Sequence, residues 1–485
     1  MIDEETLQKY DMTIGIECHV QLATTTKLFS GADNDAREAA PNTVVNPIDF
    51  GLPGMLPVLN REAVNLAIKA GKALNSEIAH VSRFDRKHYF YPDLPKGYQT
   101  TQMYHPIIIG GHVDAPLEDG TTVTVRIHHA HMEEDAGKLT HFGDYSLVDL
   151  NRAGTPLIEI VSEPDIHSPA AAKAYATELY RLMTYAGVTN GDLYHGNMRF
   201  DVNISIAPKG ALELGTRAEV KNLNSFRSVE RAAEHEFRRQ VEQLEKGERI
   251  VQETRGWDDA KQKTSSQRSK EDAQDYRYMP DADIPPIVLE DAEIAEIQAT
   301  VPHLPPYFRA QWNEAGFNKD IIDALLLSQS SAELIERIRL SSDADIAKRV
   351  GFWFLKLVSK DDAEDGPLRV ATADVADNYY IELATMVQDG KLNSNAGDAV
   401  FEEMNKTGEA PTVIAERLNL IQVSDEGAIA AIVDEVLADP ASAQAVTDLR
   451  AGNDKVIGFL VGQVMKKSQG KANPALAQKL IRERL

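Results

Sequence analysis

Apolar and polar residues alternate along several stretches of the first 210 residues, the pattern typical of β-strands with one buried face. The clearest of them predicts a strand over Met12–Leu22. Similar patterns predict strands at Thr121–His129, Leu157–Ser162 and Phe200–Ile206. Asp119-Gly120 stands between two such runs, which predicts a hairpin turn.

Helical spacing of apolar residues predicts three helices in the same region, at 61–74, 170–186 and 228–246. The last begins behind Asn224-Ser225 and ends at Gly247, residue types that favour the start and the stop of a helix. Because strands and helices do not alternate regularly, the pattern predicts an α+β fold rather than a doubly wound parallel sheet.

The strand pattern disappears at about residue 290, and the chain becomes rich in Ala, Leu, Glu and Asp with helical spacing. The polar residues 254–286 predict an irregular arm before that point. Proline or glycine interrupts the later part, last at Pro411. We therefore predict three domains: 1–293 with the sheet, 294–410 all-helical, and a small all-helical tail at 411–485.

Composition narrows the class of protein. The chain has 485 residues, 43% of them hydrophobic and 26% charged, as in globular proteins. Its longest strongly apolar run, Val456–Met465, is too short for a membrane span, which needs about 20 residues. Cys18 is the single cysteine, so an intrachain disulfide or a Cys-rich zinc site is excluded. With an acidic N-terminus that lacks a leader pattern, we expect a cytoplasmic protein.

The net charge of −24 argues against broad, non-specific binding of nucleic acid. The charge is uneven, however, because residues 449–485 carry eight basic and two acidic side chains, a net charge of +6. This basic end indicates either a local contact with a polyanion or a solvated helix face, and charge alone does not choose between them.

Candidate chemistry lies in four segments of the first domain that place acids among apolar residues. On the first strand Glu17 and His19 point to one face and Cys18 to the other. The other three segments run His131-Met-Glu133-Glu134-Asp135, Thr155 to Pro164 around Glu159, and Arg199 to Asn203 around Asp201. Buried acids are costly unless they are paired or bind a cation, and Mg²⁺ prefers oxygen ligands. Each acid alone could be salt-bridged to a basic residue; four such segments together favour a divalent-cation site.

Basic and polar residues could hold the anionic partner of such a site. The segment Arg83–Gly97 mixes cations with aromatic residues, including Lys87 and Tyr89, and could bind phosphates or stack on a base. Two further polar groups precede a helix or a glycine; they are Asn151 with Arg152, and Glu219, Lys221 and Asn222. The alternative for each is surface solubility or helix capping. The chain lacks a Walker A loop, kinase motifs, HExxH and GxSxG.

Eight segments of the chain resemble those of one known family. In order they read IGIECHVQL, FDRKHYFYPDLPKGYQTTQ, HMEEDAGK, NRAGTPLIEIVSEPD, RFDVN, EVKNLNSF, DYRYMPDADIPP and GFLVGQVMKKSQGKANP. Together they resemble the B subunits of the bacterial aspartyl/glutamyl-tRNA(Asn/Gln) amidotransferases over essentially the whole chain. Cys18 departs from the family, in which an aliphatic residue is more common at that position.

The resemblance implies a fold and a function. The fold is a cradle domain on an antiparallel sheet, followed by a helical domain and a helical tail. The function is to bind Glu-tRNA(Gln) or Asp-tRNA(Asn), to phosphorylate the side-chain carboxyl with ATP, and to let ammonia displace phosphate. The implied partners are an amidase A subunit, which releases the ammonia from glutamine, a small C subunit, and the mischarged tRNA.

The resemblance also implies roles for residues of this chain. His19, Glu134 and Glu159 are then ligands of one Mg²⁺, and Glu17, Glu134 and Asp201 are ligands of a second metal near the phosphates. Lys87 is expected to contact phosphate or the activated carboxyl. In the tail, the +6 charge of the sequence suggests that lysines contact tRNA phosphates; they are Lys455, Lys466, Lys467 and Lys471.

Two rival functions remain at this point. A self-contained glutaminase would use Cys18 as its nucleophile, but nothing around Cys18 in the sequence resembles a base with an oxyanion hole. A non-catalytic tRNA-binding scaffold would leave the chemistry to a partner. Such a scaffold has no use for the acid-bearing strands.

Overall fold

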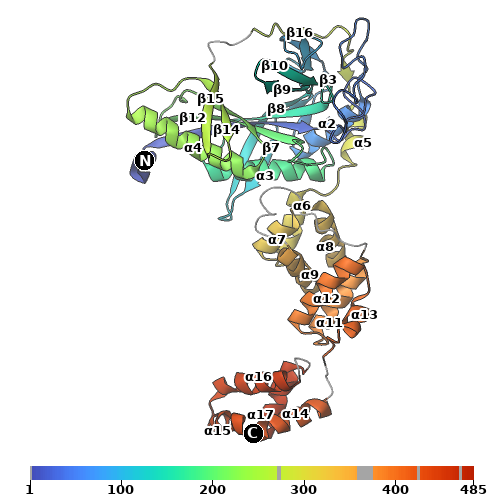
Figure 1. Ribbon diagram of the computed structural model, residues 1–485, viewed down its shortest axis with the longest axis vertical. Helices are drawn as coiled ribbons and strands as arrows, with labels where there is room; N and C mark the ends of the chain where they lie inside the picture. The colour runs from blue at the N-terminus through green and yellow to red at the C-terminus, as the bar shows by residue number, and fades with distance from the viewer. Residues whose placement is uncertain (1–2, 270–274, 358–374, 423–425, 469–471) are drawn as a thin grey trace. The chain divides into compact units, whose positions relative to one another are not determined.

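The computed structural model describes residues 3–269, 275–357, 375–422, 426–468 and 472–485 (Figure 1). They fall into two compact units, of which the first ends at Phe308 and the second begins at Arg309. All described strands lie in the first unit, and the described part of the second unit is helical. The predicted α+β class is therefore confirmed.

A ten-stranded sheet forms the centre of the first unit, and the four strands predicted from alternation all lie in it. Its described pairs are antiparallel apart from β13 and β14, which are parallel. In spatial order the strands are β15 (Lys263–Ser269), β14 (Glu253–Asp258), β13 (Ala218–Leu223), β12 (Met198–Pro208), β1 (Tyr10–Gln21), β11 (Pro156–Ser162), β8 (Thr122–Glu134), β6 (Ile108–Ile109) and β2 (Glu77–Ile78), with β7 (His112–Pro116) paired to β8. The predicted turn at Asp119-Gly120 joins β7 to β8, with Gly120 at a φ of 88°.

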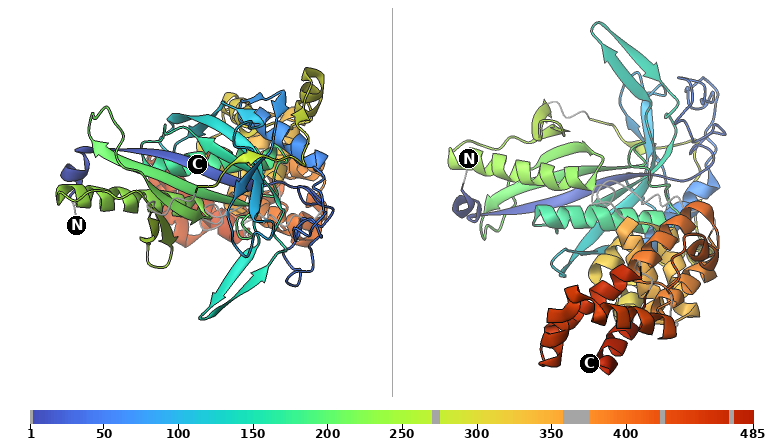
Figure 2. Two further views of the ribbon diagram at one scale, coloured as in Figure 1. Left: turned by 90° about the horizontal axis from the view of Figure 1, so that it is seen from above. Right: turned by 60° about the horizontal axis from the view of Figure 1, so that its bottom comes forward.

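Three small sheets accompany the large one. They pair β9 (Lys138–Phe142) with β10 (Tyr145–Asp149), β16 (Met279–Pro280) with β4 (Asp85–His88) and β5 (Tyr98–Thr101), and β17 (Ile287–Val288) with β3 (Val81–Ser82). The β9–β10 hairpin extends away from the large sheet in both views of Figure 2.

The hairpin of β14 and β15 corrects the prediction of an irregular arm from residue 254 onward. Its polar composition concealed the strands, because part of that polarity is satisfied inside the fold. Arg255 on β14 lies 3.1 Å from Glu236, measured from Nε to Oε1, and Glu236 is fully buried on the adjacent helix α4 (Phe226–Glu245). The ion pair of Arg255 with Glu236 thus helps to hold β14 in the fold, although this strand lacks the apolar alternation by which strands are usually predicted.

The core of the first unit lies on one face of the sheet. Along β1 the even-numbered residues from Met12 to Val20 are buried, whereas the odd-numbered ones are half-buried. Cys18 is among the buried residues, in the same cluster as Ile16 and Val20. The helices of this unit are α1 (Glu4–Leu7), α2 (Arg61–Ala73), α3 (Pro169–Tyr185), α4 (Phe226–Glu245), α5 (Asp291–Gln298) and the start of α6 (Pro305–Glu314). The three predicted helices are α2, α3 and α4.

The predicted start signal of α4 acts as expected. The Ser225 hydroxyl accepts a hydrogen bond from the Ser228 N–H at the first turn of α4, and Ser168 does the same for Ala171 at α3. Beyond the end of α4, Gly247 adopts a φ of 73°, which glycine tolerates without strain. Both helices contribute buried side chains to the core cluster beneath β1 and β12.

The second unit consists of helices among its described residues. They are the rest of α6, α7 (Lys319–Leu325), α8 (Gln329–Ser341), α9 (Ala344–Leu357), α11 (Asp377–Gln388), α12 (Ser394–Thr407), α13 (Pro411–Arg417), α14 (Glu426–Ala438), η2 (Pro440–Ser442), α15 (Ala443–Arg450), η3 (Asp454–Val456), α16 (Ile457–Lys467) and α17 (Pro474–Arg484). Helix α13 packs against α11 and α12, and a separate apolar cluster runs from Ile429 to Ile481. Among the described helices, none has the length and apolar character needed to cross a membrane.

Candidate metal centre

The face of the sheet opposite the core carries the acidic side chains. Strand pairing places them side by side, because His19 on β1 faces Glu159 on β11, and Glu159 in turn faces His131 on β8. On the other side of β1, Glu17 faces Asp201 on β12. Four strands that are distant in sequence therefore supply one continuous row of ionisable groups.

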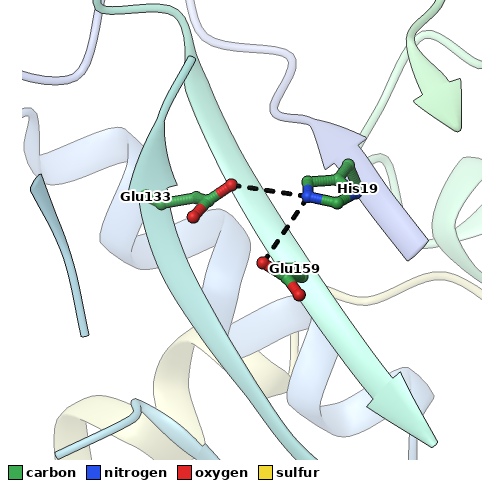
Figure 3. Close-up of side chains that lie close together, drawn as sticks. All are labelled: His19, Glu133 and Glu159. Atoms are coloured by element: carbon green, nitrogen blue, oxygen red, sulfur yellow. Dashed lines mark ion pairs between the residues drawn. The ribbon is translucent and has the colours of Figure 1, made fainter. Parts of the chain in front are cut away.

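The first group consists of His19, Glu133 and Glu159, which point toward one another in Figure 3. The Nε2 atom of His19 lies 3.6 Å from Oε1 of Glu133 and 3.5 Å from Oε2 of Glu159. Potential ligand atoms of all three residues lie within 4.8 Å of one another. Two carboxylates and one imidazole at this spacing are suited to a divalent cation.

His131 holds the two carboxylates of this group. Its Nε2 lies 3.3 Å from Oε2 of Glu159 and 3.8 Å from Oε2 of Glu133. Burial lowers the pKa of His131, but the hydrogen bonds to both carboxylates outweigh it and raise the pKa to about 10. Burial raises the pKa of Glu159, but the hydrogen bond and the charge of His131 outweigh burial and lower that pKa below its ordinary value. His131 thus orients the two acids, the role that groups behind metal ligands commonly have.

The second group consists of Glu17, Asp201 and Glu219, again with potential ligand atoms within 4.8 Å. The Nζ atom of Lys221 lies 3.1 Å from Asp201 and 3.0 Å from Glu219. Asn203 donates a hydrogen bond of 3.0 Å to Glu17. Burial and the charge of Glu159 raise the pKa of Glu17, as expected where carboxylates crowd together.

Glu134, which the resemblance assigned to both metals, lies in neither group. Its Oε1 accepts hydrogen bonds from the Thr100 N–H at 2.9 Å and from the Lys96 ammonium. The reason is the length of β8, which continues to Glu134, so that successive side chains point to opposite faces. Glu133 therefore takes the place expected for Glu134 in the first group, and Glu219 takes it in the second.

Lys87 carries a charge that the carboxylates of the first group stabilise. Burial lowers the pKa of its ammonium, but the negative charges of Glu133 and Glu159 contribute to a net rise of that pKa. The Nζ atom lies 4.9 Å from the ring centre of Tyr276, and the ring of Tyr276 lies 6.1 Å from that of Tyr89. Tyr276, to which sequence reasoning gave no role, thus lies next to both Lys87 and Tyr89, two of the predicted substrate-binding residues.

The remaining candidates have different surroundings. Asn151 is buried and anchors a neighbouring loop, because its Nδ2 donates to the Ala40 carbonyl at 2.8 Å and its Oδ1 accepts from the Val44 N–H at 3.0 Å. Arg152 contacts Asp135. Asn222 lies on β13, and its side chain falls outside the described residues. The structure thus gives Asn151 a structural contact rather than an exposed side chain.

The tail lysines lie on or next to short helices of the second unit. Lys455, Lys466 and Lys467 are exposed, and Lys467 pairs with Glu435 at 2.7 Å. Lys471 lies outside the described residues.

Sequence reasoning included Glu133 and His131 in an acid-bearing segment but assigned neither of them to the candidate metal centre. A signal for them was present, because residues two apart on a strand share a face, and a strand reaching Glu134 places His131 and Glu133 together. The prediction instead ended the strand at His129, before both residues.

Two family models match the chain. The model for the "GatB/GatE catalytic domain" matches residues 12–295, and the model for the "GatB domain" matches residues 320–485. The first covers both acidic groups, and the second covers the tail.

Curated relatives match over nearly the full length. A protein of Persephonella marina is 44% identical over 479 residues, which span 98% of this chain and 100% of the relative. One from Halorhodospira halophila is 46% identical, with 98% and 99% covered, and one from Pseudomonas fluorescens is 44% identical, with the same coverage. All three are named as the B subunit of an aspartyl/glutamyl-tRNA(Asn/Gln) amidotransferase.

Proposed function

The chain belongs to the family of B subunits of the aspartyl/glutamyl-tRNA(Asn/Gln) amidotransferases, and we propose that its two acidic groups are the site where the aminoacyl carboxyl is phosphorylated. As a member of this family it acts in a glutamine-hydrolysing ligase that amidates tRNA-bound Asp or Glu, and the family uses ATP for this reaction. The observation that carries the proposal is the pair of acidic groups on one face of the sheet.

The donor atoms of both groups fit Mg²⁺. The first offers two carboxylates and one imidazole, and the second offers three carboxylates, a set of hard oxygen ligands with one nitrogen. We assign His19, Glu133 and Glu159 to one Mg²⁺. Bound there, Mg²⁺ supplies positive charge that neutralises phosphate oxygens. Glu17, Asp201 and Glu219 would hold a second ion, for which the Lys221 ammonium now supplies the balancing charge.

The reaction needs activation because a carboxylate is a poor electrophile. A side-chain carboxylate oxygen bonds to the γ-phosphorus of ATP, the bond from that phosphorus to the bridging oxygen breaks, and ADP leaves. The nitrogen of ammonia then bonds to the acyl carbon, the bond from that carbon to the phosphate oxygen breaks, and one N–H proton leaves with the phosphate. We propose that Lys87, whose ammonium is stabilised by the charges of Glu133 and Glu159, contacts the phosphoryl oxygens.

The partners and the division of labour complete the proposal. The names of the relatives imply a multi-subunit enzyme that acts on tRNA. We propose that an amidase partner, the A subunit, supplies the ammonia, that a small C subunit joins the two, and that the enzyme is located in the cytoplasm. We also propose catalysis in residues 1–293, a helical domain at 294–410 and tRNA contact by the tail at 411–485, through Lys455, Lys466 and Lys467.

The test measures Mg²⁺-dependent ATP hydrolysis by the assembled amidotransferase, with and without mischarged tRNA. We expect mischarged tRNA to stimulate hydrolysis, and His19→Ala to lower the stimulated rate by about 100-fold or more, the order found when metal coordination is disturbed. His80→Ala is the matched control, because that imidazole is 58% exposed and lies outside both groups. Undiminished, tRNA-stimulated hydrolysis by His19→Ala would refute the proposal.

A further inference from the structure

We propose that Asp135 is a positioning residue that holds Arg152 and Arg199 as a phosphate-binding pair beside the first acidic group, with Arg199 contacting the transferred phosphoryl group. The inference rests on the proposed function, since it takes ATP as the source of that group. It adds a site for the phosphate oxygens to the metal ligands already assigned.

Asp135 is fixed in position by its own backbone. Its N–H donates to the carbonyl of Thr155 at 2.9 Å, and its carbonyl accepts from the N–H of Gly154 at 3.0 Å. Its side chain is 13% exposed. Asp135, which directly follows the last residue of β8, is therefore joined by backbone hydrogen bonds to the turn that carries Arg152.

The carboxylate of Asp135 is occupied by protein groups. Oδ1 accepts a hydrogen bond from the Ala136 N–H at 2.9 Å. Oδ2 accepts from Nε of Arg152 at 3.1 Å, from Nη2 of the same guanidinium, and from Nη2 of Arg199 at 3.3 Å. One oxygen thus joins two guanidinium groups, and Asp135 has little capacity left to act as a metal ligand.

Strand pairing places Arg199 at the metal centre. Arg199 on β12 faces His19 on β1, and directly paired residues on a sheet have Cβ atoms about 5 Å apart. The Arg199 side chain is 27% exposed and that of Arg152 is 43% exposed, so that both side chains are partly open to solvent. A phosphate held at His19 would lie within reach of Arg199.

The donor geometry of Arg199 suits a phosphate at this point. Two guanidinium groups share the carboxylate of Asp135, and Asp93 is a second acid whose charge acts on Arg152. A guanidinium has five N–H donors in a planar fork that matches phosphate oxygens. Within the described part of the chain, the ion pair of Arg199 with Asp135 occupies one Nη group. The other N–H groups of the fork can meet the equatorial oxygens of a phosphoryl group in transfer.

A purely structural role for this cluster makes a different prediction. If Asp135 only joined β8 to the turn at Arg152, replacing Arg199 would change stability and leave the rate of phosphoryl transfer unaffected. If Asp135 acts through Arg199, replacing Asp135 should slow the wild-type enzyme but should hardly change the rate of an enzyme in which Arg199 has already been replaced. The two roles are therefore separated by a double-mutant cycle.

The experiment measures kcat and the KM for ATP of tRNA-stimulated ATP hydrolysis by the assembled enzyme. The variants are Arg199→Met, Arg199→Lys, Asp135→Asn and the double variant Arg199→Met with Asp135→Asn. The control is Arg126→Met on β8, where the guanidinium pairs with Asp165 at 2.7 Å and is 67% exposed.

We expect Arg199→Met to lower kcat by about 100-fold, as for the loss of a donor to a transition-state oxyanion, and Arg199→Lys to recover part of the loss. Asp135→Asn should lower kcat by about 10-fold, and the double variant should be no slower than Arg199→Met by more than about two-fold. Unchanged kcat in Arg199→Met, or fully multiplicative effects in the double variant, would overturn the inference. If Asp135→Asn does not fold, the two Arg199 variants still decide whether Arg199 contacts phosphate.

The result also separates this inference from the proposed function. If His19→Ala abolishes hydrolysis while Arg199→Met leaves kcat intact, only the phosphate-binding pair is wrong. If the wild-type enzyme shows no tRNA-stimulated hydrolysis, the proposed function fails, and this inference fails with it.

Discussion

Exchange of Glu133 for Gln tests whether Glu133 or the adjacent Glu134 completes the first acidic group. The substitution retains the size of the side chain and removes one of the two carboxylate charges near Nε2 of His19. Glu133 is only 5% exposed, so water screens its charge poorly. Glu134→Gln is the matched comparison, since Glu134 is equally buried but binds Lys96 and the Thr100 N–H.

The expected loss follows from the electrostatics. Two unit charges about 4 Å apart interact by about 4 kcal/mol at an effective dielectric constant of about 20. Water and the neighbouring ligands replace part of that interaction, so we expect Glu133→Gln to weaken cation binding by about 3 kcal/mol, or roughly 150-fold in Kd. Glu134→Gln should change the same Kd less than about three-fold, because its amide oxygen can still accept from Thr100.

The assay is a titration of the full chain with Mn²⁺, followed by calorimetry and by the electron paramagnetic resonance of free Mn²⁺. Circular dichroism of each variant checks that it is folded. Strong loss in Glu134→Gln together with wild-type affinity in Glu133→Gln would refute the assignment, and with it the conclusion that β8 continues as a strand through both residues.

Three further outcomes are expected. Lys221→Met should lower the free energy of unfolding in EDTA by about 1 kcal/mol, a modest loss because the Lys221 side chain is 37% exposed. Mn²⁺ should restore this stability, because it balances the charges of Asp201 and Glu219. Thermal melts in both buffers check this, and a melting temperature of the variant that does not respond to Mn²⁺ would contradict it. The double variant Lys455→Ala with Lys466→Ala should weaken tRNA binding and reduce the slope of log K against log salt by about 2. Replacement of the exposed Lys261 by Ala is the control and should leave that slope unchanged. Equal slopes for the wild type, the double variant and the control would exclude contact between the tail and tRNA. Cys18→Ala should destabilise the fold by about 1 kcal/mol and leave glutamine-driven turnover intact, because Cys18 is fully buried on the core face of β1. Loss of turnover in a folded variant would support Cys18 as a nucleophile.

Alternation along Met12–Leu22 was enough to predict that Glu17 and His19 share a face and that Cys18 lies opposite. The same kind of pattern also predicted the acidic segments of β11 and β12, in which the acids stand among apolar strand residues. Local patterns of this kind depend on neighbouring residues of one strand, and the sequence displays them directly.

The choice between Glu133 and Glu134 could not be made from the same pattern. It depends on where β8 ends, and that end is set by pairing of Glu134 with Pro156 on a strand more than 20 residues away. Likewise, the Asp135 contact with Arg199 needs the register of β12 on β1, which only the folded sheet defines. Non-local pairing therefore determined which acids meet, whereas local alternation determined which acids were available.

The most direct test of the proposed phosphorylation site is to locate Mn²⁺ by anomalous diffraction in crystals of the amidotransferase soaked with a non-hydrolysable ATP analogue. The account predicts one peak within about 2.3 Å of ligand atoms of His19, Glu133 and Glu159, and a second peak at Glu17, Asp201 and Glu219 near the nucleotide phosphates. A peak coordinated by Glu134 instead of Glu133, or nucleotide phosphates bound away from both groups, would contradict it.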